Sequence, residues 1–168
     1  MNKRMYRFWV YWLVTASVIF AIQGVSWMLM GSFDPFGIYD RFLANAILDG
    51  DTFTQESKKL FHFALVMLGA TNTGFFVLFG LIANRCQSHR DRWPILILSA
   101  GLASWFILDC LGSIVLGAVF NVLLVNVPCV LVLGFPLVCL YRLTDSSTND
   151  FQAPDEQSDP RQALERPL

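Results

Sequence analysis

Asp109 is the only formally charged side chain within the four long apolar segments of this sequence. A carboxylate near the middle of a bilayer costs roughly 2.5–3.5 kcal/mol on insertion scales, so such residues usually face other helices and often mark a functional site. The alternative is a neutral carboxyl group that joins two helices through a hydrogen bond. Asp109 is therefore either a functional or a structural residue, and the sequence leaves both interpretations open.

One helical face around Asp109 carries small and polar residues. Steps of four from Asp109 lead to Gly101, Trp105, Ser113 and Gly117, and residues four apart lie on the same face of a helix. Small and polar side chains at such positions favour contact with neighbouring helices over contact with lipid. We therefore expect Asp109 and Trp105 to face the interior of the protein.

Further polar side chains are predicted to lie near the depth of Asp109. At a rise of ~1.5 Å per residue, Gln23, Asp109 and Asn126 each lie about 10 Å from the outer end of their apolar segment. Gln23 and Asn126 are therefore the expected hydrogen-bond partners of Asp109, with Asn121 and His62 in the same outer half. The candidate ligand-binding or helix-coupling residues are Asp109, Gln23, Asn126, Asn121, His62 and Trp105.

The same residues do not suggest a metal, a cofactor or a catalytic set. His62 has no second His or Cys at ligand spacing, so we expect no metal. The four cysteines form no Cys-x-x-Cys motif, which argues against a thiol oxidoreductase. A membrane enzyme would use Asp109 and His62 as acid and base, but their expected depths differ by roughly 8 Å at the helical rise.

Membrane-spanning helices must position these side chains. The chain has 168 residues, of which 55% are hydrophobic and 15% charged, whereas soluble domains carry about 25% charged residues. A spanning helix needs about 20 apolar residues. We predict an all-α, polytopic membrane protein with a four-helix transmembrane domain over 1–143, and a hairpin turn at Gly117 and Ala118 between its last two spans. The expected spans are about 8–30, 60–83, 94–116 and 120–141.

The segments outside the spans are predicted from local patterns. Between the first two spans, Gly37–Leu48 places apolar residues near helical spacing, so it is either a short interfacial helix or an irregular loop. Thr52 and Gln55 form a capping-box pattern for the second span. Pro128 is expected to kink the last span. Residues 144–168 are poor in apolar side chains and are predicted to form a disordered cytoplasmic tail.

The orientation is predicted from the basic residues in the short flanks. The N-terminus, the 84–92 loop and the residue after the fourth span carry Arg and Lys, and all three fall on one side of the membrane. We therefore expect both termini in the cytoplasm. A formal net charge of −1 provides no basic field, so a nucleic-acid partner is not expected.

The last two spans also carry a resemblance to known proteins. The stretch from Trp105 to Ser113, continuing through Gly117 to Phe120 and Asn121, resembles a pattern in small uncharacterised four-helix integral membrane proteins of bacteria. The resemblance implies four helices and no activity. We expect the protein to lie in the bacterial inner membrane.

Three functions are compatible with these features. The favoured one is a binding or accessory protein whose outer polar cluster holds a lipid headgroup, a small molecule or a partner membrane protein. The alternative is a proton-coupled small-molecule transporter subunit that acts through Asp109, and four spans would then require a homo-oligomer. The third is a membrane-embedded enzyme.

Overall fold

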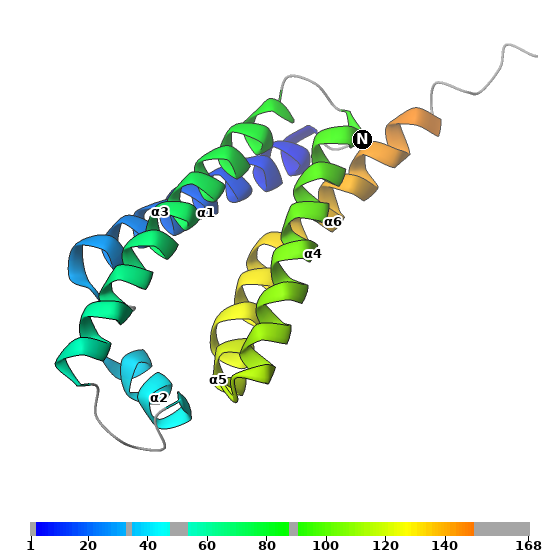
Figure 1. Ribbon diagram of the computed structural model, residues 1–168. Coiled ribbons are helices and arrows are strands. Elements are labelled where there is room, and N and C mark those ends of the chain that lie inside the picture. The colour runs from blue at the N-terminus through cyan, green and yellow to red at the C-terminus, as the bar shows by residue number, and fades with distance from the viewer. Residues whose placement is uncertain (1–2, 33–34, 48–53, 88–90, 150–168) are drawn as a thin grey trace, which may run out of the picture.

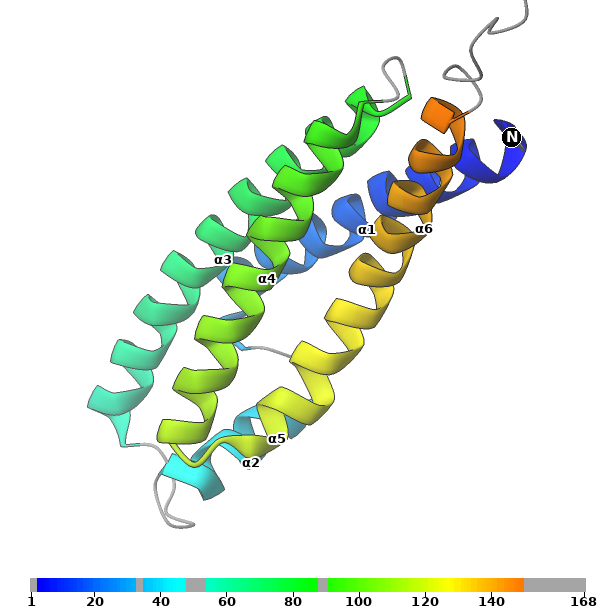
Figure 2. The same ribbon diagram turned by 90° about the vertical axis from the view of Figure 1, so that its right-hand side faces the viewer.

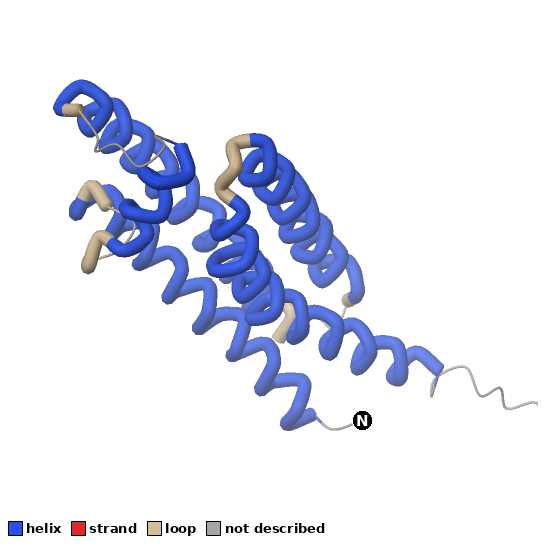
Figure 3. The backbone as a smooth tube through the Cα atoms, turned by 90° about the horizontal axis from the view of Figure 1, so that it is seen from below, coloured by secondary structure: helices blue, strands red, loops and turns tan. Residues whose placement is uncertain are grey.

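The computed structural model describes residues 3–32, 35–47, 54–87 and 91–149, apart from the side chains of 145–149. Helices account for nearly all of these residues, and the described part of the chain contains no strand (Figure 3). In chain order the elements are α1 Lys3–Met30, α2 Ile38–Ile47, α3 Gln55–Arg85, α4 Arg92–Val115, α5 Val119–Asn121, the π-helical turn η1 Val122–Asn126, and α6 Val127–Asn149.

Four helical segments are long and apolar enough to cross a membrane: Lys3–Met30, Gln55–Arg85, Arg92–Val115 and Val119–Thr144. The last of these joins α5, η1 and most of α6 into one continuous span. The predicted all-α, four-helix fold is therefore confirmed, and the chain is a multi-pass membrane protein.

The helices are arranged as two pairs (Figures 1 and 2). α1 packs along α3 in the most extensive pairing, and α4 packs along α6. The start of α1, the end of α3, the start of α4 and the end of α6 lie at one end of the molecule, which we call the terminal end (Figure 1). α2 and α5 lie at the opposite end, which we call the α2 end (Figure 1).

The packed apolar core lies toward the terminal end. Its members come mainly from the first halves of α1 and α4, the second half of α3, and α6, and at its edge the Tyr6 hydroxyl donates a hydrogen bond of 3.0 Å to the Cys86 carbonyl oxygen. Fully buried members include Tyr6, Val10, Leu13, Ala83, Leu133 and Leu140. Among the described residues, none from α2, α5 or η1 belongs to this core.

A hairpin joins α4 to the last span at the predicted position. Gly117 has a φ of +73°, which glycine adopts without steric cost. Its N–H donates to the Ile114 carbonyl oxygen at 3.1 Å, and the Ala118 N–H donates to the Ser113 carbonyl oxygen at 2.8 Å. These two bonds form a Schellman motif, so α4 ends here and the chain reverses.

The structure refines the other boundaries. α2 confirms the helix interpretation of the 37–48 segment, where the loop was the alternative. α3 begins at Gln55 with Thr54 as its N-cap, which accepts a hydrogen bond of 3.2 Å from the Ser57 N–H; Thr52, the expected cap, lies outside the described residues. α6 continues to Asn149, so the segment predicted as a tail from 144 begins as helix, and 150–168 lies outside the described residues.

A π-helical turn precedes the first proline of the last span. The Val127 N–H donates to the Val122 carbonyl oxygen, five residues earlier, at the end of η1. Pro128 follows directly and has no N–H to donate. The wider turn accommodates the proline ring next to the preceding carbonyl groups, so the irregularity expected at Pro128 takes the form of a π turn before it.

Candidate functional site

Asp109 belongs to a hydrogen-bond network at the α2 end. Asn121 Nδ2 donates to Asp109 Oδ2 at 3.0 Å and to Ser113 Oγ at 2.8 Å. The hydroxyl of Tyr39 donates to Asn121 Oδ1 at 2.6 Å. We call these four residues the Asn121 network. It joins α2, α4 and α5, so it fixes α2 against the hairpin of the second helix pair.

The expected partner of Asp109 was wrong, although its inward orientation was right. Asn121, rather than Asn126 or Gln23, binds the carboxylate. The turn at Gly117 reverses the chain so tightly that Asn121 lies beside Ser113 and Asp109. The depth estimate from the ideal helical rise misses this contact, because it includes neither the geometry of the turn nor the extra residue in the π-helical turn η1.

Asn126 is fully buried one turn deeper. Its Nδ2 donates to Cys110 Sγ at 3.4 Å, and its Oδ1 has no hydrogen-bond partner. Asn126 therefore contacts Cys110, the residue that follows Asp109 on α4, and is not part of the Asn121 network. Its role in the described structure is helix coupling between η1 and α4.

Tyr39 is the site residue that sequence reasoning missed. Nothing in its local sequence shows that α2 folds back onto α5. Burial, together with the nearby carboxylates of Asp109 and Asp40, raises the pKa of its hydroxyl to about 12. The ring packs edge-on against Phe120, with 5.2 Å between the centroids. The neutral hydroxyl is therefore a stable donor to Asn121.

Two adjoining cavities occupy the space at the α2 end. The outer cavity, of about 320 Å³, lies between α1, α2 and the start of the last span, and its lining includes Gln23, Trp27, Tyr39, Phe42 and Asn121. The interior cavity, of about 230 Å³, lies between all four spans. The residues that line both cavities are Gln23, Trp27, Leu124 and Val125.

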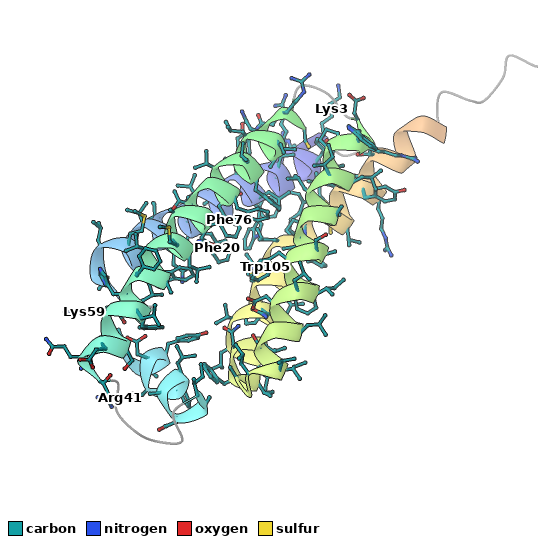
Figure 4. The ribbon with its side chains drawn as sticks, in the orientation of Figure 1. Lys3, Phe20, Arg41, Lys59, Phe76 and Trp105 are labelled. Atoms are coloured by element: carbon teal, nitrogen blue, oxygen red, sulfur yellow. The ribbon has the colours of Figure 1, made fainter. Side chains whose placement is uncertain are left out.

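Aromatic side chains form much of the interior cavity. Phe20 and Phe76 are stacked with 4.8 Å between their centroids. Figure 4 shows both extending from the α1–α3 pair toward Trp105, which extends from α4. All three line the interior cavity. Trp105 therefore faces the interior, as its helical face predicted.

Two of the candidates predicted from the sequence remain, Gln23 and His62. Gln23 lines both cavities, and no hydrogen bond joins its side chain to Asp109 among the described residues. His62 is exposed on α3 and lies against Gly31, where a Cβ would meet its ring. Within the described ranges no hydrogen bond joins His62 to Asp109, and no three His, Cys, Asp or Glu residues gather as a metal site.

Comparisons with protein-family models, with curated proteins and with solved structures return no match for this chain. The geometry of the cavities and of the Asn121 network is thus the basis for assigning a function.

Proposed function

We propose that this chain is a membrane-embedded binding protein and that the two adjoining cavities at the α2 end form its ligand site. Ligand pockets have volumes of about 300–1,000 Å³ and are mostly apolar and aromatic, with a few polar groups that orient the ligand. The outer cavity, at about 320 Å³, combines aromatic side chains with the polar groups of Gln23, Tyr39 and Asn121. This combination suits an amphiphilic ligand.

The observation that carries the proposal is that the interior cavity is lined by residues of all four spans. Two larger pockets, of about 400 and 480 Å³, are each lined by only two helices, α1 with α6 and α1 with α3. Close packing is the rule in protein interiors, and unfilled space costs stability. A bound ligand at the α2 end would supply the missing contacts.

The proposal includes an orientation. Basic residues of the described chain are more numerous at the terminal end, where Lys3, Arg4, Arg7, Arg85, Arg92 and Arg142 lie, than at the α2 end. The positive-inside rule then gives cytoplasmic termini in a bacterial inner membrane. The α2 end faces outward, and a ligand reaches the cavities from the outer leaflet or the outer solution.

Native mass spectrometry of the protein in lipid nanodiscs tests the proposal. We expect a bound small molecule or lipid that survives removal of the disc. Leu124→Trp places an indole in the shared wall of both cavities and should remove the bound species. Leu123→Trp is the matched control, because Leu123 is similarly exposed, at 64% against 59% for Leu124, and lines neither cavity. Equal retention by both variants would contradict the assignment.

A proton-coupled transporter subunit is the second candidate function. It is favoured by one contact, in which Asn121 lines the outer cavity and also binds the Asp109 carboxylate. A ligand that displaces Asn121 would then remove this hydrogen bond from the Asp109 carboxylate. Transport would be supported by a proton flux into liposomes that depends on added ligand and is lost in Asp109→Asn. If the ligand binds without a proton flux, the assignment as a binding protein stands.

A further inference from the structure

Three aromatic side chains from two helices line the outer cavity: Trp27 from α1, and Tyr39 and Phe42 from α2. The face of an aromatic ring attracts cations through its quadrupole, and groups of such rings recognise quaternary ammonium ions. Phe120 supports two of the three rings from behind, with centroid separations of 5.2 Å to Tyr39 and 5.6 Å to Phe42. The aromatic wall is therefore held in place before a ligand binds.

The charges near this wall have one sign. The Asp109 carboxylate lies behind Asn121 at 3.0 Å. Asp40 follows Tyr39 on α2; its Oδ2 accepts a hydrogen bond of 2.7 Å from Ser32, and its Oδ1 is buried without a partner. Among the described residues, no Lys, Arg or His lines the outer cavity. Arg41, Lys58 and Lys59, the described basic residues of this end, are exposed.

The hydrogen-bonding groups of the cavity favour one kind of cation. A primary ammonium has three N–H donors that need acceptors when they leave water. Asn121 Oδ1 already accepts from Tyr39, and both contacts of Nδ2 are within the Asn121 network. Besides Asn121, the side chains of the lining that can accept a hydrogen bond are those of Gln23 and Tyr39, fewer than three N–H donors need. A quaternary ammonium needs no acceptor, so it fits this lining better.

We infer that the ligand is an amphiphile with a quaternary ammonium head, which lies in the outer cavity against Trp27, Tyr39 and Phe42, while its apolar body extends into the interior cavity. This inference rests on the proposed function. The interior cavity adjoins the outer one through Gln23, Trp27, Leu124 and Val125. Its rings, from Phe20, Phe76 and Trp105, provide apolar surface for the body of the ligand.

The test compares two ligands that differ in charge alone. Octyltrimethylammonium and its neutral isostere, in which carbon replaces the nitrogen, are dialysed to equilibrium against the protein in phosphatidylethanolamine nanodiscs, with empty nanodiscs to correct for partition into lipid. We expect the cation to bind at least tenfold more tightly than the isostere. Equal or tighter binding of the isostere would overturn the inference and would leave the cavity as a neutral-ligand site.

Two variants test whether the bound cation lies in the outer cavity. Phe42→Leu should weaken cation binding at least fivefold and change binding of the isostere little, because an apolar side chain without a π face replaces the ring. Phe63→Leu is the control, since Phe63 is exposed on α3 and lines neither cavity. Equal effects of the two variants on cation binding would contradict the aromatic wall, and the isostere shows that Phe42→Leu still folds.

Further measurements distinguish failure of this inference from failure of the proposed function, and they identify the source of the ligand. If both ligands bind equally tightly and Leu124→Trp removes both, the binding function stands and charge selection fails. If neither binds and no molecule copurifies, the proposed function fails as well. Phosphatidylcholine nanodiscs identify the source once the cation has bound: competition by this lipid indicates a choline headgroup as the occupant, and undiminished binding indicates a free quaternary amphiphile.

Discussion

The side chain of Asn121 makes three hydrogen bonds: Nδ2 donates two, and Oδ1 accepts one. The network therefore fixes the orientation of its amide, since exchange of O and N would place donors against the Tyr39 hydroxyl and an oxygen against the Asp109 carboxylate. A single uncharged side chain thus positions the Asp109 carboxylate relative to α2. The sequence marks Asp109 by its charge, but only the turn at Gly117 reveals its partner.

Asp109 is expected to contribute stability mainly through this hydrogen bond. Asp109→Leu removes the acceptor and should lower the free energy of unfolding by about 1–2 kcal/mol, the scale of an intramembrane hydrogen bond. Asp109→Asn keeps an amide oxygen as acceptor and should cost less. Reversible unfolding in mixed micelles measures both changes. If the two substitutions are equally destabilising, charge rather than hydrogen bonding is the stabilising property of Asp109.

Tyr39 should give the fold a dependence on alkaline pH. Its pKa is raised from 10.0 to about 12 in the folded protein, first by burial and then by the nearby carboxylates. The folded state thus retains the proton between these values, where the unfolded state loses it. The stabilisation is fully present below pH 10 and falls as pH rises through 12.

Melting temperatures in detergent between pH 9 and 12 measure this loss. Tyr39→Phe should flatten the decline, because it removes the titrating hydroxyl and its hydrogen bond to Asn121. Tyr11→Phe, at an exposed position of α1, is the control and should retain the decline. A decline that persists unchanged in Tyr39→Phe would show that another group titrates.

At the scale of elements, the sequence predicts the four long helices because each contains about 20 apolar residues. It predicts α2 less decisively, since ten residues with mixed polarity suit both a helix and a loop. The contact between Tyr39 on α2 and Asn121 on α5 spans 82 positions, and no local pattern encodes a contact at that separation. The outer cavity, which α2 covers with Tyr39 and Phe42, therefore could not be predicted from the sequence.

The stability of the hairpin should depend on the absence of a side chain at Gly117. Gly117→Ala places a Cβ on a backbone with a φ of +73°, which should destabilise the protein by about 1 kcal/mol. Gly112→Ala is the matched control, because Gly112 lies within α4 and a Cβ there would meet nothing within 4 Å. Gly112→Ala should be neutral or slightly stabilising. Thermal unfolding of the two variants compares them directly, and a neutral Gly117→Ala would contradict the argument.

At the scale of the whole molecule, the interior and outer cavities extend from the packed core toward the α2 end. The sequence predicts a polar cluster toward this end, because Gln23, Asp109 and Asn121 all lie near the same ends of their spans. It does not predict the cavities themselves, since empty space depends on how the helices pack against one another. Four apolar helices thus enclose an interior cavity that their composition alone does not reveal.

The orientation of the whole molecule decides from which side a ligand reaches these cavities, and single cysteines can determine it. Phe36→Cys introduces a thiol at the α2 end, where Phe36 is 79% exposed. Gln87→Cys introduces one at the terminal end, where Gln87 is also exposed. Burial raises the pKa of the native Cys86 thiol to about 11. Cys86 is therefore a poor nucleophile near neutral pH, and it adds little background labelling next to Gln87.

We expect a membrane-impermeant maleimide to label Phe36→Cys in intact spheroplasts, and to label Gln87→Cys only after the membrane is opened. The physical reason is the excess of Arg and Lys at the terminal end, which retains that end in the cytoplasm. The unmodified protein gives the background from its native thiols. The reverse pattern of labelling would place the α2 end in the cytoplasm, and the aromatic wall of the outer cavity would then receive its ligand from the inner leaflet.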